Sequence, residues 1–254
     1  MSEKTYLVVG LGNIGAEYAT TRHNIGFIIL DAWAQASNIS FTPDRYGDIA
    51  LVKDKGRKFY LLKPSTYMNL SGNAVRYWIQ KLDIDIQSTI IICDDVNLPF
   101  ETLRMRKAGS DGGHNGLKNI CDLLGTSSYP RIRVGVGHDY EQGRQIEYVL
   151  GNFSDEECKI IPEIAKKIIE GVRTWAFVGA EKAMTSLKPC AIAATACLWA
   201  FPDWTSGTSS RRRSRPSGWQ RRLWNARYHK HPRGEGVVFQ MWAKPFVPRG
   251  CVNA

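Results

Sequence analysis

The chain has 254 residues, of which 43% are hydrophobic, and this is enough to bury a core in one or two domains. No apolar run approaches the ~20 residues that a membrane-spanning helix needs, so we expect a cytoplasmic protein with no membrane contact. The six cysteines lack the paired spacing of a metal site or a disulfide framework. We therefore expect a globular protein with reduced thiols.

The formal net charge of +10 is unevenly distributed along the chain. Residues 1–184 carry equal numbers of basic and acidic side chains, so the whole basic excess follows residue 184. A balanced body can still bind RNA if its basic residues gather on one face. Net charge alone therefore neither supports nor excludes a nucleic-acid partner.

Short apolar runs alternate with segments of helical period along the body of the chain. The expected strands cover residues 6–9, 49–52, 59–62, 90–93, 103–107 and 132–136, with Lys55-Gly56 as the turn of a hairpin. The expected helices cover residues 25–36, 71–82 and 115–124, and Ser71 is expected to cap the second of them. Ser154 followed by Glu157 is a capping box that predicts a further long helix toward Met184.

This order of elements predicts an α/β fold. We expect a single domain over residues 1–187, with a mixed β-sheet, helices on both faces and a hairpin at one edge. Residues 188–254 form a second, basic and tryptophan-rich segment, which we expect to be irregular.

Four polar islands interrupt the apolar pattern where strands end or helices begin. They read GLGNIGAEYATTRHNIGF (10–27), KPSTYMNLSG (63–72), DDVNLP (94–99) and GSDGGHNGLK (109–118). Ligands of open α/β sheets collect outside the carboxyl ends of the strands, so these islands should converge in space. We predict one active site containing Asn13, His23, Asn69, Asp94 and Asn115.

His23 precedes a helix and lies beside a glycine loop, which suits an accessible imidazole that takes a proton from water. Such a base needs an orienting partner, and Asp94 at the end of an apolar strand is the candidate. Asp95 competes for this role, although adjacent residues of a strand point to opposite sides. For His23 in isolation, helix capping or a surface hydrogen bond is the alternative.

The first island also satisfies the G-x-G-x-x-G pattern of dinucleotide-binding proteins through Gly10, Gly12 and Gly15. That pattern works only where the loop runs directly into a helix whose N-terminus holds the pyrophosphate. Here the helical period begins only near Ile25, and the acidic residue expected after the second strand is missing. A dinucleotide-binding oxidoreductase is therefore an alternative of lower rank.

The four islands, in this order, resemble the bacterial peptidyl-tRNA hydrolase family across roughly residues 4–187. The resemblance implies hydrolysis of the ester between a peptide and the 3′-terminal ribose of tRNA, with neither a metal nor another cofactor. It also implies a monomer that binds the acceptor stem and 3′ end of peptidyl-tRNA. The segment 136–139 lacks the proline-containing turn expected of the family, which leaves its local shape open.

The resemblance also assigns roles to individual residues. His23 would be the base and Asp94 its partner, while the amides of Asn13, Asn69 and Asn115 would hold the substrate end, the attacking water and the tetrahedral intermediate. The substrate-binding residues would be Tyr18, Met68, Gly113 and His114, with Arg106 and Arg133 on the 5′-phosphate of the tRNA. Taken singly, each asparagine is equally explained as a turn or cap residue.

The C-terminal segment suggests a third hypothesis, that the protein binds RNA without catalysis. It contains the run Arg-Arg-Arg-Ser-Arg at 211–215 and five of the eight tryptophans. Basic residues interleaved with tryptophan can bind RNA through phosphate contacts and stacking. No helical or strand period is sustained there, so we favour a fused or out-of-frame extension over a non-catalytic RNA-binding protein.

Overall fold

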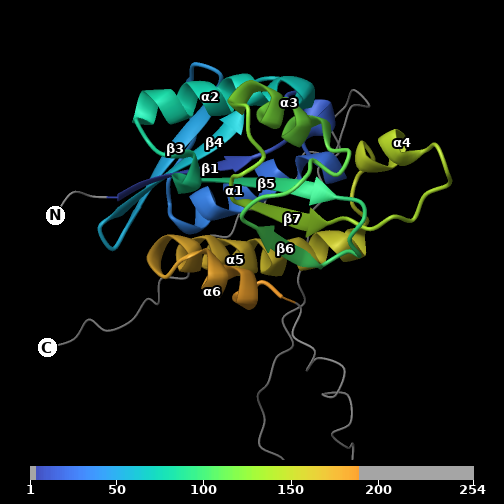
Figure 1. Ribbon diagram of the computed structural model, residues 1–254. Coiled ribbons are helices and arrows are strands. Elements are labelled where there is room, and N and C mark those ends of the chain that lie inside the picture. Colours follow the sequence, from blue (N-terminus) through green and yellow to red (C-terminus); the bar gives the residue numbers. More distant parts are fainter. Residues whose placement is uncertain (1–3, 189–254) are drawn as a thin grey trace, which may run out of the picture. The chain divides into compact units, whose positions relative to one another are not determined.

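The computed structural model describes residues 4–188, and these residues build a seven-stranded sheet between two layers of helices (Figure 1). The strand order is β2-β3-β4-β1-β5-β7-β6. The central strands β4, β1, β5 and β7 are parallel, whereas β2, β3 and β6 run antiparallel to their neighbours. In chain order the strands are β1 (Lys4–Gly10), β2 (Thr42–Asp44), β3 (Gly47–Asp54), β4 (Arg57–Pro64), β5 (Thr89–Asp95), β6 (Leu103–Arg106) and β7 (Arg131–Gly135).

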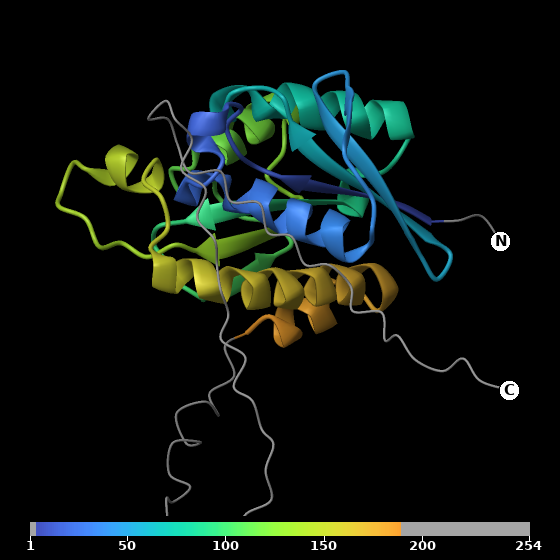
Figure 2. The ribbon, with the colours of Figure 1, turned by 180° about the vertical axis from the view of Figure 1, so that it is seen from behind.

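Helices cover both faces of this sheet, which confirms the predicted fold class. One face carries α1 (Ile25–Ala36) and the long α5 (Asp155–Phe177), against which α6 (Ala180–Ser186) packs (Figure 2). The other face carries α2 (Ser71–Leu82) and α3 (Asn115–Leu124). The short α4 (Gln145–Val149) lies beside the sheet, near the tip of β5 (Figure 1).

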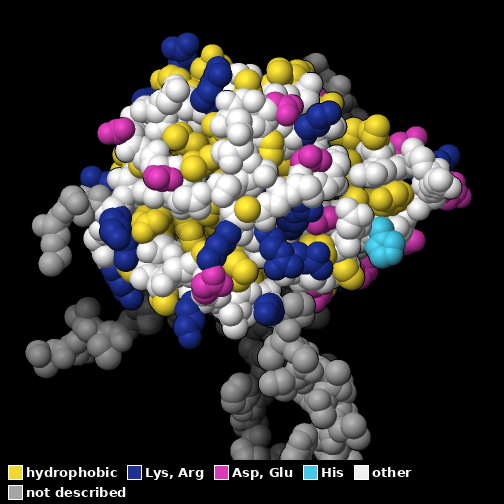
Figure 3. Space-filling model, viewed as in Figure 1, with side chains coloured by type: hydrophobic (Ala, Val, Ile, Leu, Met, Phe, Trp, Pro, Cys, Tyr) yellow, Lys and Arg dark blue, Asp and Glu magenta, His cyan; other side chains and the backbone are white. Residues whose placement is uncertain are grey.

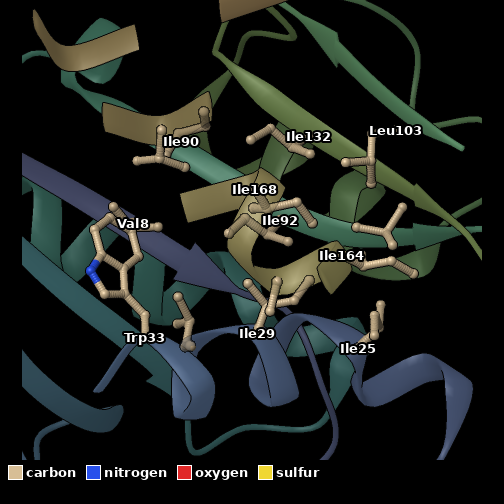
Figure 4. Close-up of a cluster of buried hydrophobic side chains, with 14 of the residues drawn as sticks. Val8, Ile25, Ile29, Trp33, Ile90, Ile92, Leu103, Ile132, Ile164 and Ile168 are labelled. Atoms are coloured by element: carbon tan, nitrogen blue, oxygen red, sulfur yellow. The ribbon is translucent and has the colours of Figure 1, made fainter. Parts of the chain in front are cut away.

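Alternation along the strands divides the buried residues into two clusters, one on each face. The first cluster joins α1 and α5 to the sheet through branched aliphatic side chains and Trp33 (Figure 4). Its central members include Val8, Ile29, Ile92 and Ile168, which are fully buried. The second cluster lies under α2 and α3. A core on both faces holds the sheet rigidly, and the ends of its strands can therefore position a site.

Most of the predicted elements are confirmed. The helices at 25–36 and 115–124 have the predicted bounds, and β3 and β4 form the predicted hairpin. Lys55 and Gly56 both have positive φ, at 46° and 76°, as a two-residue hairpin turn requires. The buried thiol of Cys93 is free, as expected.

Two helix predictions need correction. Ser71 is the first residue of α2 and does not cap it, because its hydroxyl donates to the carbonyl of Met68. The capping box of Ser154 and Glu157 does start α5, but this helix ends at Phe177 and does not continue to Met184. Gly179 has a φ of 119°, which is incompatible with a helix, and α6 starts after it.

Two further predictions concern the C-terminal segment and membrane-spanning helices. The extension predicted for 188–254 lies outside the described residues, apart from Lys188. Among residues 4–188, none of the helices combines the length and apolar character that crossing a bilayer would require. The helix α4 was not predicted, since its five residues are too few to establish a period.

Candidate active site

The segments following β1, β4 and β5 meet at one edge of the sheet, at the carboxyl ends of its parallel strands. They enclose a cleft of about 580 Å³, and α4 contributes a further wall. Most predicted site residues line this cleft: Asn13, His23, Met68, Asn69, Asp94, Gly113, His114, Asn115 and Arg133. The structure therefore brings the four polar islands together, as the sequence predicted.

Two imidazoles share one buried carboxylate at the floor of the cleft. His23 Nδ1 lies 2.9 Å from Oδ1 and 3.0 Å from Oδ2 of Asp94. His114 Nε2 lies 3.0 Å from the same Oδ1, and the two rings are 5.1 Å apart between centroids. The Asp94 side chain is 4% exposed and that of His23 is 14% exposed, so the pair is largely shielded from water.

Hydrogen bonding fixes the proton on each ring. Nδ1 of His114 accepts the backbone N–H groups of Gly116 (3.1 Å) and Leu117 (3.3 Å), because His114 is the N-cap of α3. Its Nε2 must therefore carry the hydrogen and donate to Asp94. His23 donates through Nδ1, which leaves its Nε2 unprotonated. Within residues 4–188 this Nε2 has no partner, so it is available to a water in the cleft.

The pKa values of the pair shift in the directions of a charge-stabilised base. Burial by itself lowers the pKa of His23, but the charge of Asp94 and its hydrogen bond outweigh burial and leave that pKa raised. Burial raises the pKa of Asp94, but His23 and His114 overcome this effect and hold it well below its ordinary range. Asp94 is therefore ionised whenever His23 takes a proton.

The neighbouring acid, Asp95, has a different role. Its Oδ2 lies 3.0 Å from Nη1 of Arg133, and its Oδ1 accepts the backbone N–H of Asn97 at 2.9 Å. Arg133 also donates to the carbonyl of Ser110 at 2.6 Å, in the loop that leads to His114. Asp94, and not Asp95, is thus the partner of His23, because successive residues of β5 face opposite sides.

Asn13 is held by a residue that the sequence analysis did not select. The buried side chain of Asn24 accepts the backbone N–H of Asn13 at 2.8 Å and donates to its carbonyl at 2.9 Å. The side-chain oxygen of Asn13 accepts the backbone N–H of Met68 at 2.9 Å, which links the first and second islands. The only sequence signal for Asn24 is its place directly after His23.

Three side-chain carboxamides that face the cleft can still form hydrogen bonds to a ligand. Within the described part of the chain, the side-chain nitrogen of Asn13 and the side chains of Asn69 and Asn115 have no hydrogen-bond partner. Asn69 lies in the single turn η3 (Met68–Leu70), and Asn115 is the first residue of α3. These groups can donate to a carbonyl or accept from a water without charging.

Two predicted substrate-binding residues do not line the cleft. Tyr18 lies in the short turn η1 (Ala16–Tyr18), ahead of the turn that carries His23. Arg106 pairs with Arg131, the first residue of β7, whereas the cleft lies at the other end of that strand. Arg106 is exposed, but it can reach a ligand only outside the cleft.

His114 lines the cleft, but both nitrogens of its ring are occupied, one by Asp94 and the other by the N-terminus of α3. The ring nitrogens therefore support Asp94, and its predicted contact with the substrate stays a prediction. Gly113 has a φ of 80° beside it, and a Cβ there would meet no atom within 4 Å, so the loop is open on this side.

An apolar wall of the cleft was missed by the sequence analysis. It is formed by Ile146, Val149 and Leu150 in and after α4, with Tyr67 before η3. Ile146 is 72% exposed and Tyr67 is 56% exposed, which is unusual for large apolar side chains. Exposed apolar residues give no sequence signal of their own, since only the fold places them beside the polar floor.

His23, Asp94 and His114 are also possible metal ligands, because their donor atoms lie within 4.8 Å of one another. However, the Nε2 of His114 carries a hydrogen and has no lone pair to offer while its Nδ1 caps α3. Ligation would therefore break both hydrogen bonds of that cap. The donor set fits a hydrogen-bonded relay better than a metal centre.

The glycine loop does not form a dinucleotide site. Gly15 is followed by two short 3₁₀ turns, and α1 begins only at Ile25, so no helix N-terminus faces the loop. A Cβ on Gly10 would lie 2.3 Å from the carbonyl oxygen of Gly26, and one on Gly12 would lie 2.8 Å from the ring of Phe27. These glycines allow α1 to pack closely on β1, which accounts for them without a nucleotide.

Comparison with known proteins gives the family of this chain. A family model described as peptidyl-tRNA hydrolase matches residues 7–195. The chain belongs to the peptidyl-tRNA hydrolase family. Peptidyl-tRNA hydrolases of Bacteroides fragilis and Desulfitobacterium hafniense are 54% and 43% identical to it, over 70% of this chain and 96% of each relative.

A solved peptidyl-tRNA hydrolase from Acinetobacter baumannii has the same fold. Its TM-score is 0.68 at 30% identity, and the match covers 74% of this chain and 96% of that one. The peptidyl-tRNA hydrolase match stops at residue 195, so most of the basic C-terminal segment lies beyond it.

Proposed function

We propose that this chain hydrolyses the ester of peptidyl-tRNA and that His23 is the general base that activates the attacking water. One observation carries the assignment of the base. The imidazole is bonded through Nδ1 to both oxygens of a buried, ionised Asp94, and its Nε2 faces a cleft lined by three carboxamides. Family membership supplies the substrate class.

The reaction follows from this arrangement in two steps. His23 Nε2 removes a proton from water as the oxygen attacks the ester carbonyl, and Asp94 stabilises the imidazolium that forms. Donors from Asn13, Asn69 or Asn115 stabilise the negative oxygen of the tetrahedral intermediate. The imidazolium then returns its proton to the departing 3′ oxygen of the ribose, which releases tRNA and the peptide acid. These steps need no metal ion.

The tRNA is placed by basic side chains beside the cleft. Lysine and arginine gather over the edge strand β6 and its neighbour β7 (Figure 3), and Arg104 and Arg106 of β6 are exposed. Arg133 lies in the cleft itself, fixed by Asp95. We propose that Arg133 binds phosphate next to the ester while Arg106 contacts the acceptor stem farther along the sheet.

We propose that the enzyme acts as a monomer, as the family resemblance implies. Its substrate arises during protein synthesis, so we place the activity in the cytoplasm. The apolar wall at α4 provides a surface for the uncharged peptide side of the substrate, opposite the basic strands.

The test is hydrolysis of N-acetylated aminoacyl-tRNA by the full chain and by His23→Ala. We expect this variant to lose at least about 100-fold in kcat, as is typical when a general base is removed. His138→Ala is the matched control, because His138 is exposed and does not line the cleft. Equal activity of His23→Ala and His138→Ala would reject His23 as the base.

A further inference from the structure

The residue before His23 turns away from the cleft and holds a different part of the chain. Arg22 donates through Nη1 to the carbonyl of Asn152 and through Nη2 to Oε2 of Glu157 at 2.8 Å. Its backbone N–H donates to the carbonyl of Gly151 at 3.0 Å. The side chain is 13% exposed, so these contacts are largely protected from solvent. One residue thus fastens the His23 turn to the segment that leads into α5.

Glu157 connects Arg22 to the N-terminus of α5. The same Oε2 that accepts from Arg22 also accepts the backbone N–H of Ser154 at 2.7 Å, as one half of the capping box of α5. Thr21 and Asn152 also form an isolated antiparallel β-bridge. The N-terminus of α5 and the turn that carries His23 therefore share one hydrogen-bonded junction.

The guanidinium of Arg22 also reaches the wall of the cleft. It lies over the ring of Tyr148 in α4 at 4.6 Å and near that of Phe153 at 5.4 Å. The hydroxyl of Tyr148 donates to the carbonyl of Val136 at 2.8 Å, after β7. Tyr148 is thus fixed on two sides, and its neighbours in the chain include the cleft residues Ile146 and Val149. Arg22 therefore touches the element that forms the apolar wall.

The turn that carries His23 has little rigidity of its own. It is the single 3₁₀ turn η2 (Arg22–Asn24), and its N-cap side chain makes no capping hydrogen bond. Its three residues bind three different segments: Arg22 the start of α5, His23 the end of β5, and Asn24 the loop of Asn13. Because so short a turn cannot resist displacement, these attachments determine where the imidazole lies.

We propose that Arg22 is a positioning residue for hydrolysis, which fixes both the His23 turn and the α4 wall to the start of α5 and so sets their separation across the cleft. This inference rests on the proposed role of His23 as the base. A purely structural Arg22 would secure α5 and stabilise the fold, and its replacement would leave the reaction unchanged in the folded protein.

The chain offers a matched control in Arg57. Its guanidinium likewise lies over two rings, at 4.5 Å from Phe177 and 5.8 Å from Tyr6, and donates to the hydroxyl of Tyr6. Arg57 begins β4, at the opposite end of the strand from the cleft. Arg22→Lys and Arg57→Lys keep the charge but lose the planar fork that bonds and stacks at once.

The experiment measures kcat, KM and melting temperature for both variants, with assays well below the lower melting temperature. We expect both variants to have a lower melting temperature than the wild type. Only Arg22→Lys should also lose about 10- to 100-fold in kcat, since small misplacements of a reacting group reduce rates by factors of this size. An NMR titration of His23 gives a second readout. Its midpoint should fall in Arg22→Lys, where the imidazole moves away from Asp94, and should not change in Arg57→Lys.

Equal kcat and equal His23 midpoints in the two variants would overturn the proposal and leave Arg22 as a structural residue. If Arg22→Lys does not fold, Tyr148→Leu and Tyr148→Phe replace it. The leucine variant loses the ring under Arg22 and should raise KM, while the phenylalanine variant keeps the ring and should raise it less. The outcome for His23→Ala separates the two hypotheses, because an active His23→Ala rejects His23 as the base whatever Arg22 does.

Discussion

Asp94→Asn tests the centre of the site by removing a charge while keeping its shape. Asp94 accepts hydrogen bonds from two imidazoles, and the hydrogen on His114 Nε2 is fixed because its Nδ1 caps α3. An asparagine oxygen would therefore turn to His114, and its NH₂ group would face His23. His23 could then meet that group only with an unprotonated Nδ1, which places its hydrogen on Nε2. The proposed base would then carry a hydrogen on Nε2, the nitrogen that must accept the proton of the water.

The size of the effect follows from the contacts. A hydrogen bond to a charged group contributes about 1.5–3 kcal/mol, so loss of the Asp94 charge opposite an imidazolium lowers the rate about 10- to 150-fold. The tautomer change adds to this loss, and the analogous change in serine proteases reduces kcat by about 10⁴-fold. We therefore expect kcat/KM of Asp94→Asn to fall by at least about 100-fold.

The dependence of kcat/KM on pH provides the more specific assay. In the proposed mechanism the neutral form of His23 is the active one. Because Asp94 raises the pKa of His23, the acidic limb of the wild-type profile should lie above the ordinary histidine value of ~6.5. In Asp94→Asn the burial that lowers the pKa remains, but the opposing charge is gone. The limb of the residual activity should therefore move to lower pH.

Asp95→Asn is the control for this experiment. Asp95 is also buried, but it binds Arg133 and not a histidine. We expect its loss to raise KM through Arg133 while the acidic limb of the profile does not move. An Asp94→Asn enzyme with the wild-type limb would refute the assignment of His23 as the titrating base.

Three other predictions concern the amides, the tRNA contacts and the C-terminal segment. Asn13→Ala removes the acceptor for the backbone N–H of Met68 and a free donor in the cleft, so single-turnover hydrolysis should slow about 10²- to 10³-fold. Arg106→Gln should raise KM and reduce the slope of log KM against log salt concentration by about one unit. The same change at the exposed Lys166 is the control and should leave the slope unchanged. An unchanged slope in Arg106→Gln would count against a phosphate contact. A chain ending at Lys188 should keep full activity on N-acetylated aminoacyl-tRNA; an inert truncated chain whose isolated C-terminal segment binds tRNA would favour the RNA-binding alternative.

The sequence predicted the elements well where the local signal was strong. The apolar run before Asp94 lies in a buried parallel strand, and the helix at 25–36 has a clear period. The helix prediction failed at the end of α5. The helical period of apolar residues continues across Gly179, but the helical backbone is interrupted there. The prediction also failed for α4, whose single turn packs on Arg22 through Tyr148 and has no amphipathic pattern of its own.

The site shows the same division. The residue types indicated a candidate chemistry, since a histidine, an acid at a strand end and three amides suit the activation of a water. The roles of Asn24, Arg22 and His114 could not be read from type alone. Each acts through a backbone group or an aromatic ring that is distant in sequence, such as the main chain of Asn13 or the carbonyl of Asn152.

The sequence by itself determined the α/β class, the order of the main elements and the candidates for catalysis, because hydrophobic period and residue chemistry are local properties. Only the tertiary structure decided that His114 shares Asp94 with His23, that Arg106 lies away from the cleft, and that an apolar wall opposes the polar floor. The physical reason is that orientation and distance depend on strand register and helix packing. Both are set by contacts between residues far apart in the chain.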